Sequence, residues 1–152
     1  MSNLSGKYAI VGVGETQIGK VPNVSTLALH LDAIKRALQD AGLRNDQVNG
    51  LLTNQPMHDP VRSYGVIVAN AAGIKTRYTT DLGLGGATPV AMGIHAAMAL
   101  EAGLADAVVC VHARNQASKK LLPHRGEIRD GWEDFEEPYG LVTAVANHAL
   151  AA

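Results

Sequence analysis

Apolar residues along this chain fall into short continuous runs separated by longer segments of helical character. Four apolar runs predict buried strands, at residues 7–13, 49–53, 78–82 and 107–113. Three segments between them predict helices, at residues 25–41, 60–72 and 88–102. Strands and helices alternate in this order, which predicts a layered α/β fold with helices on both faces of a mostly parallel sheet.

Capping residues sharpen the predicted helix boundaries. Ser25 is a good N-cap for the first helix, and Gly42 follows it where a C-terminal cap belongs. Asp59 and Thr88 each precede a proline, the combination that begins a helix. The segment 88–102 is almost uncharged, so it is predicted to be a buried helix.

The last part of the chain has a different character. Residues 115–137 are polar and rich in turns, and are interpreted as an excursion over the functional face. Residues 141–152 predict a new helix that lacks a terminal cap. We therefore expect the chain to stop inside a domain, with one half-domain at 1–114 and the start of an inserted region at 115–152.

Composition narrows the class of protein. A chain of 152 residues that is 47% hydrophobic can bury one core, and its formal net charge of -1 argues against a nucleic-acid binder. The sequence contains no secretory signal and no apolar run of the roughly 18 residues that a membrane span needs, so we expect a cytoplasmic protein. One cysteine and six histidines without ligand spacing predict neither a disulfide nor a metal site.

Two glycine-rich turns are candidates for chemistry. Gly12 and Gly14 follow the first predicted strand, but Gln17 replaces the third glycine of a dinucleotide fingerprint, so a plain loop is the competing interpretation. The turn Gly85–Gly86–Ala87 precedes the apolar helix, whose N-terminus stabilises negative charge. No nucleophile lies at this turn, and the hydroxyl of Thr88 is interpreted as an N-cap.

Two side chains of the last predicted strand are candidates for chemistry or for ligand binding. Cys110 lies among valines with no basic neighbour, which predicts a buried and inert thiol. His112 lies near the carboxyl end of the strand, where ligands of α/β proteins bind. Contact with a substrate and packing at the rim of the core both remain open for His112.

The polar excursion carries two further groups of candidates. Its basic residues either meet the phosphates of a cofactor such as coenzyme A or form a solvated loop: Lys119, Lys120, Arg125 and Arg129. An acidic run at 133–137 argues against a simple phosphate patch. Its aromatic residues predict packing onto the domain itself, a partner subunit or an acyl chain: Trp132, Phe135 and Tyr139.

Three stretches carry a resemblance to a known family: KYAIVGVGETQIGK, DLGLGGATPVAMGIHAAMALEAGLADAVVCVHA and EEPYGLVTAVANHALAA. They resemble the thiolase superfamily, and most of all its branch of sterol-carrier-type thiolases, lipid-transfer proteins and acetyl-CoA acetyltransferases. The resemblance covers essentially the whole chain but only the first part of the family's architecture. It implies the N-terminal βαβαβαβ half of a layered α-β-α-β-α fold, usually a dimer.

The resemblance also implies where the family's chemistry would lie. Thiolases carry a nucleophilic cysteine at the start of the buried helix, and that position falls on Gly86 here. Glycine cannot form an acyl-enzyme. The histidine and second cysteine that thiolases use would lie beyond Ala152, so this chain alone is not expected to complete a catalytic cycle.

Two functions follow from the resemblance. The first is an enzyme on acyl-CoA thioesters that cleaves a C–C bond without a covalent intermediate, or a related acyl transferase, with a zinc-ribbon and OB-fold partner protein. Coenzyme A would be part of the substrate rather than a resident cofactor. The expected contacts of the substrate are Gly85, Gly86, Ala87, His112 and Tyr139. The alternative is a non-catalytic lipid or acyl-CoA carrier or scaffold subunit beside another thiolase-like protein. Substrate cleavage distinguishes them.

Half of such a sandwich would expose the helix face that meets the other half. We therefore expect residues 88–102 of this chain to exchange their amide protons readily or to drive self-association.

Overall fold

The computed structural model describes residues 3–56, 61–118, 137–139 and 149. The chain divides into two compact units, Met1–Lys119 and Lys120–Ala152. The first unit contains all the helices and strands described below. In the second unit, Glu137–Tyr139 form a short 3₁₀ turn.

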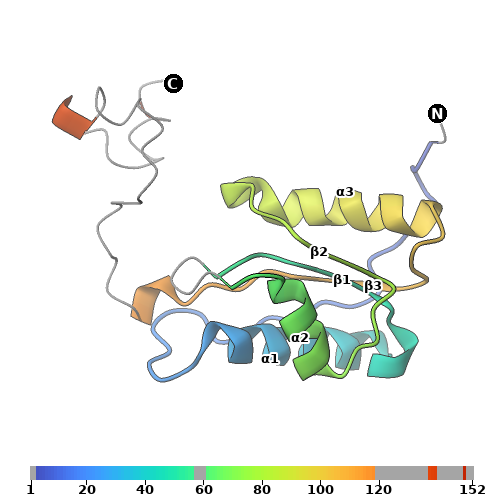
Figure 1. Ribbon diagram of the computed structural model, residues 1–152, viewed down its shortest axis with the longest axis horizontal. Coiled ribbons are helices and arrows are strands. Elements are labelled where there is room, and N and C mark those ends of the chain that lie inside the picture. The colour runs from blue at the N-terminus through green and yellow to red at the C-terminus, as the bar shows by residue number, and fades with distance from the viewer. Residues whose placement is uncertain (1–2, 57–60, 119–136, 140–148, 150–152) are drawn as a thin grey trace. The chain divides into compact units, whose positions relative to one another are not determined.

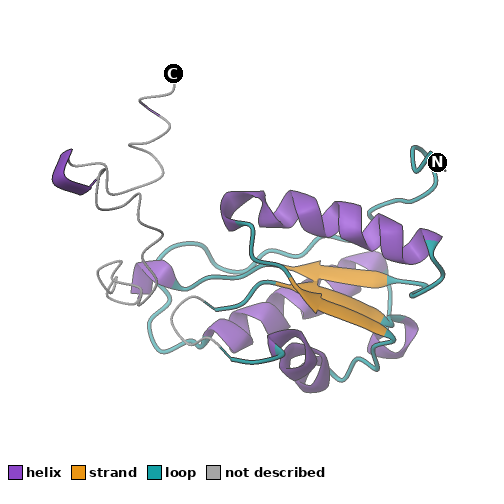
Figure 2. Ribbon diagram, turned by 45° about the horizontal axis from the view of Figure 1, so that its top comes forward, coloured by secondary structure: helices purple, strands orange, loops and turns teal. Residues whose placement is uncertain are grey.

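A three-stranded parallel sheet forms the centre of the first unit. Its strands β1 (Gly50–Thr53), β2 (Tyr78–Asp81) and β3 (Val108–Val111) lie in the order β2-β1-β3. Helices α1 (Thr26–Ala41) and α2 (Tyr64–Ala72) cover one face, and α3 (Thr88–Glu101) covers the other (Figure 1). Figure 2 shows the same layers from a second direction. The predicted layered α/β fold is therefore confirmed.

Helix α1 begins and ends at the predicted caps. The Ser25 hydroxyl accepts a hydrogen bond from the Ala28 amide at 3.0 Å, which satisfies one free N–H of the first turn. Gly42 ends the helix with a φ of 67°, a conformation that glycine adopts without strain. The helix turns Ile34 and Leu38 toward the sheet, where both are buried.

The main core lies between the sheet and the pair α1 and α2. Its strand residues are Leu51, Val109 and Val111, and its helical residues include Ile34, Leu38 and Val68. Successive strand side chains point to opposite faces, so Leu52 lies on the other face, the side of α3. Burial of such side chains is the main stabilising contribution to the fold.

The predicted strand at 7–13 is wrong. β1 pairs directly with both β2 and β3, and the segment instead runs unpaired against α1. A Cβ on Gly14 would lie 2.4 Å from the Ala33 carbonyl oxygen, and one on Gly12 would lie 2.4 Å from that of Ala37. The apolar side chains that suggested a buried strand are exposed here, with Ile10 at 88%. The two glycines therefore allow close packing onto a helix.

Helix α2 begins later than predicted, at Tyr64 instead of residue 60. Its N-terminus is completed by a distant side chain, since the Asp81 carboxylate accepts a hydrogen bond from the Gly65 amide at 2.7 Å. A carboxylate at this end also complements the helix dipole. The predicted N-cap Asp59 and the proline after it lie outside the described residues.

Helix α3 has the predicted bounds, but it is not buried on all sides. Met92 and Ala99 face the sheet and are buried, whereas Val90, Ile94 and Met98 form an exposed apolar stripe, with Val90 at 72%. The predicted helix at 141–152 lies outside the described residues except for Ala149. Among the helices that the structure describes, none is long and apolar enough to cross a membrane.

Candidate functional site

The glycine turn before α3 is held by Thr88. This residue is 1% exposed, and its hydroxyl accepts a hydrogen bond from the Leu84 amide at 2.9 Å and donates one to the Gly85 carbonyl at 2.8 Å. The predicted N-cap role of Thr88 is therefore wrong: Ala87 is the cap residue, and Thr88 is the first residue of the helix. Its hydroxyl binds backward to the turn, which fixes the 3₁₀ conformation of Gly85–Ala87.

Open space lies in front of this turn. A Cβ on Gly86 would meet no heavy atom within 4 Å, and Gly85, Gly86 and Ala87 are all exposed. Gly85 has a φ of 55°, which favours glycine there. The N-terminus of α3 favours negative charge, so the turn offers room and positive potential to an anionic oxygen.

His112 follows β3 on the side of the sheet that α3 covers. The Cys110 thiol contacts the Met92 carbonyl of α3 at 3.6 Å, and side chains two residues apart share a face. The Nε2 atom of His112 is buried and has no hydrogen-bond partner among the described residues. Burial lowers the pKa of His112 below its usual value, and the charges of Arg114 and His30 lower it further. The ring is therefore neutral at neutral pH, and its buried Nε2 makes no hydrogen bond to the described residues.

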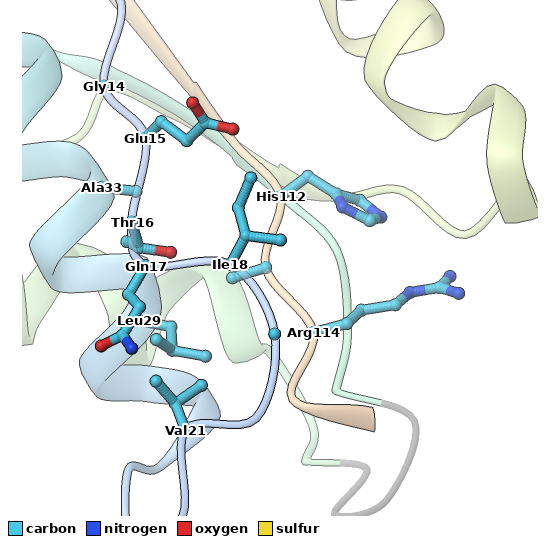
Figure 3. A pocket seen from close by; sticks show the side chains of 12 residues that line it. Gly14, Glu15, Thr16, Gln17, Ile18, Val21, Leu29, Ala33, His112 and Arg114 are labelled. Atoms are coloured by element: carbon cyan, nitrogen blue, oxygen red, sulfur yellow. The ribbon is translucent and has the colours of Figure 1, made fainter. Parts of the chain in front are cut away.

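A cavity of about 290 Å³ lies between the loop 14–21, α1 and the end of β3. His112, Ala113 and Arg114 form one wall, and Leu29 and Ala33 of α1 form another (Figure 3). The side chains of His112 and Arg114 extend to the same side of their strand. The glycine turn Gly85–Ala87 is not among the residues that line this cavity.

A buried polar cluster, which was not predicted from the sequence, lies behind the cavity wall. His30 and Asn54 are 0% and 2% exposed and bond to each other, with 3.1 Å between His30 Nε2 and Asn54 Oδ1. Asn54 also binds both backbone groups of Ala113. One signal was present in the sequence: His30 precedes the core residues Ile34 and Leu38 at intervals of four, on one helical stripe.

Cys110 differs from its prediction in one respect. The residue as a whole is exposed on the edge strand β3, which the sequence did not predict. Its sulfur nevertheless lies against the Met92 carbonyl, and burial of the thiol raises its pKa to about 11. The exposed surface belongs to the residue as a whole, whereas the pKa depends on the surroundings of the sulfur. The thiol is protonated at neutral pH.

Several predicted contacts remain predictions. Lys119, Lys120, Arg125 and Arg129 lie outside the described residues. Tyr139 belongs to the second unit and is 84% exposed. Within the part of the chain that the structure describes, no three His, Cys, Asp or Glu side chains are grouped so that they could hold a metal ion.

The chain is similar in sequence to two curated proteins. No protein-family model matches the chain. It is 35% identical over 157 residues to the 17-hydroxy-3-oxo-4-pregnene-20-carboxyl-CoA lyase of Mycobacterium tuberculosis, a match that covers 98% of this chain and 40% of the lyase. It is 36% identical over 119 residues to a steroid side-chain-cleaving aldolase of Thermomonospora curvata, covering 78% of this chain and 29% of the aldolase.

The chain is also similar in fold to solved structures. The chain superimposes on the Ltp2-ChsH2(DUF35) aldolase with a TM-score of 0.72 and 32% identity, over 91% of this chain and 35% of that one. It superimposes on a monomeric SCP2-thiolase-like protein from Mycobacterium smegmatis with a TM-score of 0.58 and 22% identity, over 71% and 23%. The fold is therefore thiolase-like. The two relatives with 35% and 36% identity are named as a carboxyl-CoA lyase and a steroid side-chain-cleaving aldolase, and the chain spans less than half of their length.

Proposed function

We propose that this chain is the N-terminal part of a thiolase-like enzyme that cleaves a C–C bond of β-hydroxyacyl-CoA thioesters by a retro-aldol reaction. The observation that carries this proposal is Gly86 at the start of α3, with open space where a side chain would lie. The names of two relatives, a carboxyl-CoA lyase and a steroid side-chain-cleaving aldolase, support it. We place the chain in the sterol-carrier-type branch that lacks the nucleophilic cysteine, with residues 1–114 as its first half-domain.

The chemistry explains why glycine suits this position. In a retro-aldol cleavage a base removes the proton of the β-hydroxyl, the bond between the α and β carbons breaks, and a ketone or aldehyde forms. The electron pair moves into the thioester as an enolate, which takes a proton at the α carbon. No covalent bond to the protein forms, so no nucleophile is required, and Gly86 leaves room for a bulky substrate.

The chain's own residues supply the anion site in this proposal. The turn Gly85–Ala87 and the N-terminus of α3 stabilise the enolate oxygen as it gains charge. The neutral ring of His112, with an unpartnered Nε2, orients the thioester carbonyl or the hydroxyl. We propose Tyr139 as a further substrate contact. The acid and base that move the two protons are assigned to residues beyond this chain.

The proposal includes partners. Coenzyme A enters with the substrate, and Lys119, Lys120, Arg125 and Arg129 are the proposed contacts of its phosphates. A solved neighbour whose name joins two proteins, Ltp2 and ChsH2, supports the need for a partner, and we propose one of the zinc-ribbon and OB-fold kind. We also propose a homodimer.

The competing function is a non-catalytic carrier or scaffold subunit. The same open turn and apolar α3 stripe would bind an acyl chain or another thiolase-like protein without chemistry. This alternative predicts binding of acyl-CoA without turnover.

One assay separates the two. Protein purified from its native source, with its intact mass recorded, is incubated with a β-hydroxyacyl-CoA, with and without the proposed partner. Retro-aldol activity yields a ketone and a shortened acyl-CoA in equal amounts by mass spectrometry, and the protein mass stays unchanged. An acylated protein, or products that require free coenzyme A, would refute the retro-aldol proposal, and binding without products would favour the carrier.

A variant pair tests the role of Gly86. Gly86→Val fills the open space and is expected to lower kcat/KM by at least about tenfold. Gly93→Val, on an exposed position of α3 with nothing near its Cβ, is the matched control and should retain activity. Equal activity in the two variants would contradict a substrate at Gly86.

A further inference from the structure

The ring of His30 is enclosed by three segments of the chain. Its Nδ1 lies 2.8 Å from the Thr26 carbonyl of its own helix, and its Nε2 lies 3.1 Å from Asn54 Oδ1, just after β1. The Tyr64 hydroxyl of α2 lies 3.3 Å from Nδ1, and the two rings meet edge to face at 5.3 Å. The His30 side chain has no exposed surface.

The side chain of Asn54 has only one orientation that fits. Its Oδ1 accepts a hydrogen bond from the Ala113 amide at 3.0 Å, and its Nδ2 donates to the Ala113 carbonyl at 3.2 Å. A flipped amide would turn both contacts into donor–donor and acceptor–acceptor pairs. Asn54 therefore holds both backbone groups of the residue between His112 and Arg114, and it presents an acceptor oxygen to His30.

This cluster lies behind the wall of the cavity. Ala113 belongs to one wall. Leu29 and Ala33, which flank His30 on α1, belong to the other wall. The bonds from α1 through Asn54 to Ala113 therefore fix the distance between the two walls.

A neutral ring cannot satisfy every hydrogen bond of the cluster, and a charged ring satisfies them but meets no negative charge. A neutral imidazole has one N–H, so it can donate to only one of the two oxygens that face it. The Tyr64 hydroxyl can donate to Nδ1, which matches a ring protonated on Nε2. A charged ring would donate to both oxygens, yet the titratable groups that face it are Tyr64 from α2 and His112 from the end of β3, and neither supplies negative charge.

Burial decides between these forms. It lowers the pKa of His30 below its usual value, and the hydrogen bonds to Thr26 and Asn54 oppose this shift without cancelling it. A group with a lowered pKa binds fewer protons in the closed form than in a solvated form. The closed form is therefore favoured above a pH of about 6.5 and loses stability as the pH falls below that value.

We propose that Asn54 is a positioning residue for the end of β3 and that His30 makes its hold sensitive to acid. With a neutral ring, the pair ties α1 to Ala113 and keeps His112 and Arg114 in place at the cavity wall. Proton uptake by His30 favours a locally open form in which the ring is solvated and the Asn54–Ala113 bonds are broken. The consequence for catalysis rests on the proposed function, but the structural proposal does not, and its test uses no activity.

Nuclear magnetic resonance of the full 152-residue chain gives the test. Between pH 7 and pH 5, the protection factor of the Ala113 amide is expected to fall by up to about 25-fold, the limit set by an ordinary histidine pKa of about 6.5 in the open form. The fall should begin at a higher pH than the titration of the His30 ring, read from its imidazole ¹⁵N shifts, because the pKa of the ring is lowered in the closed form. The neutral ring should show a protonated Nε2.

Three variants sharpen the result. His30→Gln keeps a donor toward Asn54 but cannot titrate, so Ala113 protection should no longer depend on pH. His95→Gln, a change on α3 away from the cluster, is the control and should retain the wild-type dependence. Asn54→Leu should remove Ala113 protection at every pH and shift the His30 Nε2 resonance, while the Val68 amide in the core stays protected.

Two results would overturn the proposal. The first is an Ala113 amide whose protection is unchanged while the His30 ring titrates, since the ring would then take up its proton in place. The second is an acid-dependent loss in His30→Gln equal to that of the wild type. If His30→Gln does not fold, the wild-type titration still decides, because Ala113 protection must begin to fall near the ordinary histidine pKa, before the ring of the closed form takes up its proton.

Discussion

The thiol of Cys110 should react slowly, and the structure sets how slowly. Its pKa of about 11 leaves about 0.1% thiolate at pH 8, whereas an ordinary cysteine with a pKa of about 8.5 is about one quarter thiolate. The ratio of thiolate fractions is about 240. A thiolate of higher pKa is also the stronger nucleophile, by about 13-fold for this difference at a Brønsted slope of about 0.45. The net expectation is a rate about 20-fold below that of an ordinary thiol.

The assay is the reaction of the folded chain with an aromatic disulfide between pH 7 and pH 10, followed by absorbance. The double variant Gly86→Cys, Cys110→Ala serves as the reference protein. It places a thiol in open space at a helix N-terminus, where the pKa of the thiol is lowered. The wild-type rate should rise about tenfold per pH unit through pH 10. The reference rate should reach its plateau by about pH 9.

The form of the pH profile is the decisive observation. A wild-type rate that reaches a plateau near pH 8.5 would show a solvated Cys110 thiol. It would refute the reasoning that contact with the Met92 carbonyl removes the sulfur from water on an otherwise exposed edge strand.

Three further predictions concern stability and association. Gly14→Ala places a Cβ against the α1 backbone and should lower the free energy of unfolding in urea by about 1–3 kcal/mol. The control Gly93→Ala, with open space around it, should raise this energy by up to about 1 kcal/mol, and equal effects would refute the close packing. Thr88→Val leaves a backbone donor and acceptor of the glycine turn without their partner and should cost about 1–3 kcal/mol in the same assay. Ile94→Glu interrupts the exposed stripe of α3 and should reduce self-association in sedimentation; a wild-type chain that is monomeric with protected α3 amides would contradict this expectation.

The parts of the fold that the sequence predicted correctly depend on local patterns. Helix α1 has its apolar stripe within sixteen consecutive residues and its caps directly on either side, and the three strands of the sheet are short apolar or β-branched runs. The errors arose where the deciding partner is distant in sequence. The start of α2 depends on Asp81, and the fate of residues 7–13 depends on the direct pairing of β1 with β3, which no local pattern reveals.

The features of the candidate site also differ in whether the sequence could predict them. The glycine turn and the position of His112 could be placed from the order of strand, turn and helix. The cluster of His30 and Asn54 could not, because each residue is polar by itself and is buried only when four separate segments meet. The Thr88 hydroxyl was predicted to cap the helix, but it bonds to the backbone of the preceding turn. The sequence alone does not distinguish these two sets of hydrogen-bond partners.

The attachment of the N-terminal segment has a consequence for folding during synthesis. Lys7 and Tyr8 bind Glu101, and Val21 bonds to Ser118, at separations of 94, 93 and 97 residues. Asn115 holds the same segment through the carbonyls of Val21 and Val24. This segment therefore leaves the ribosome before nearly all the rest of the first unit, and its partners do not yet exist at that time. Exposed apolar side chains such as that of Ile10 would meanwhile be accessible to chaperones or to neighbouring nascent chains.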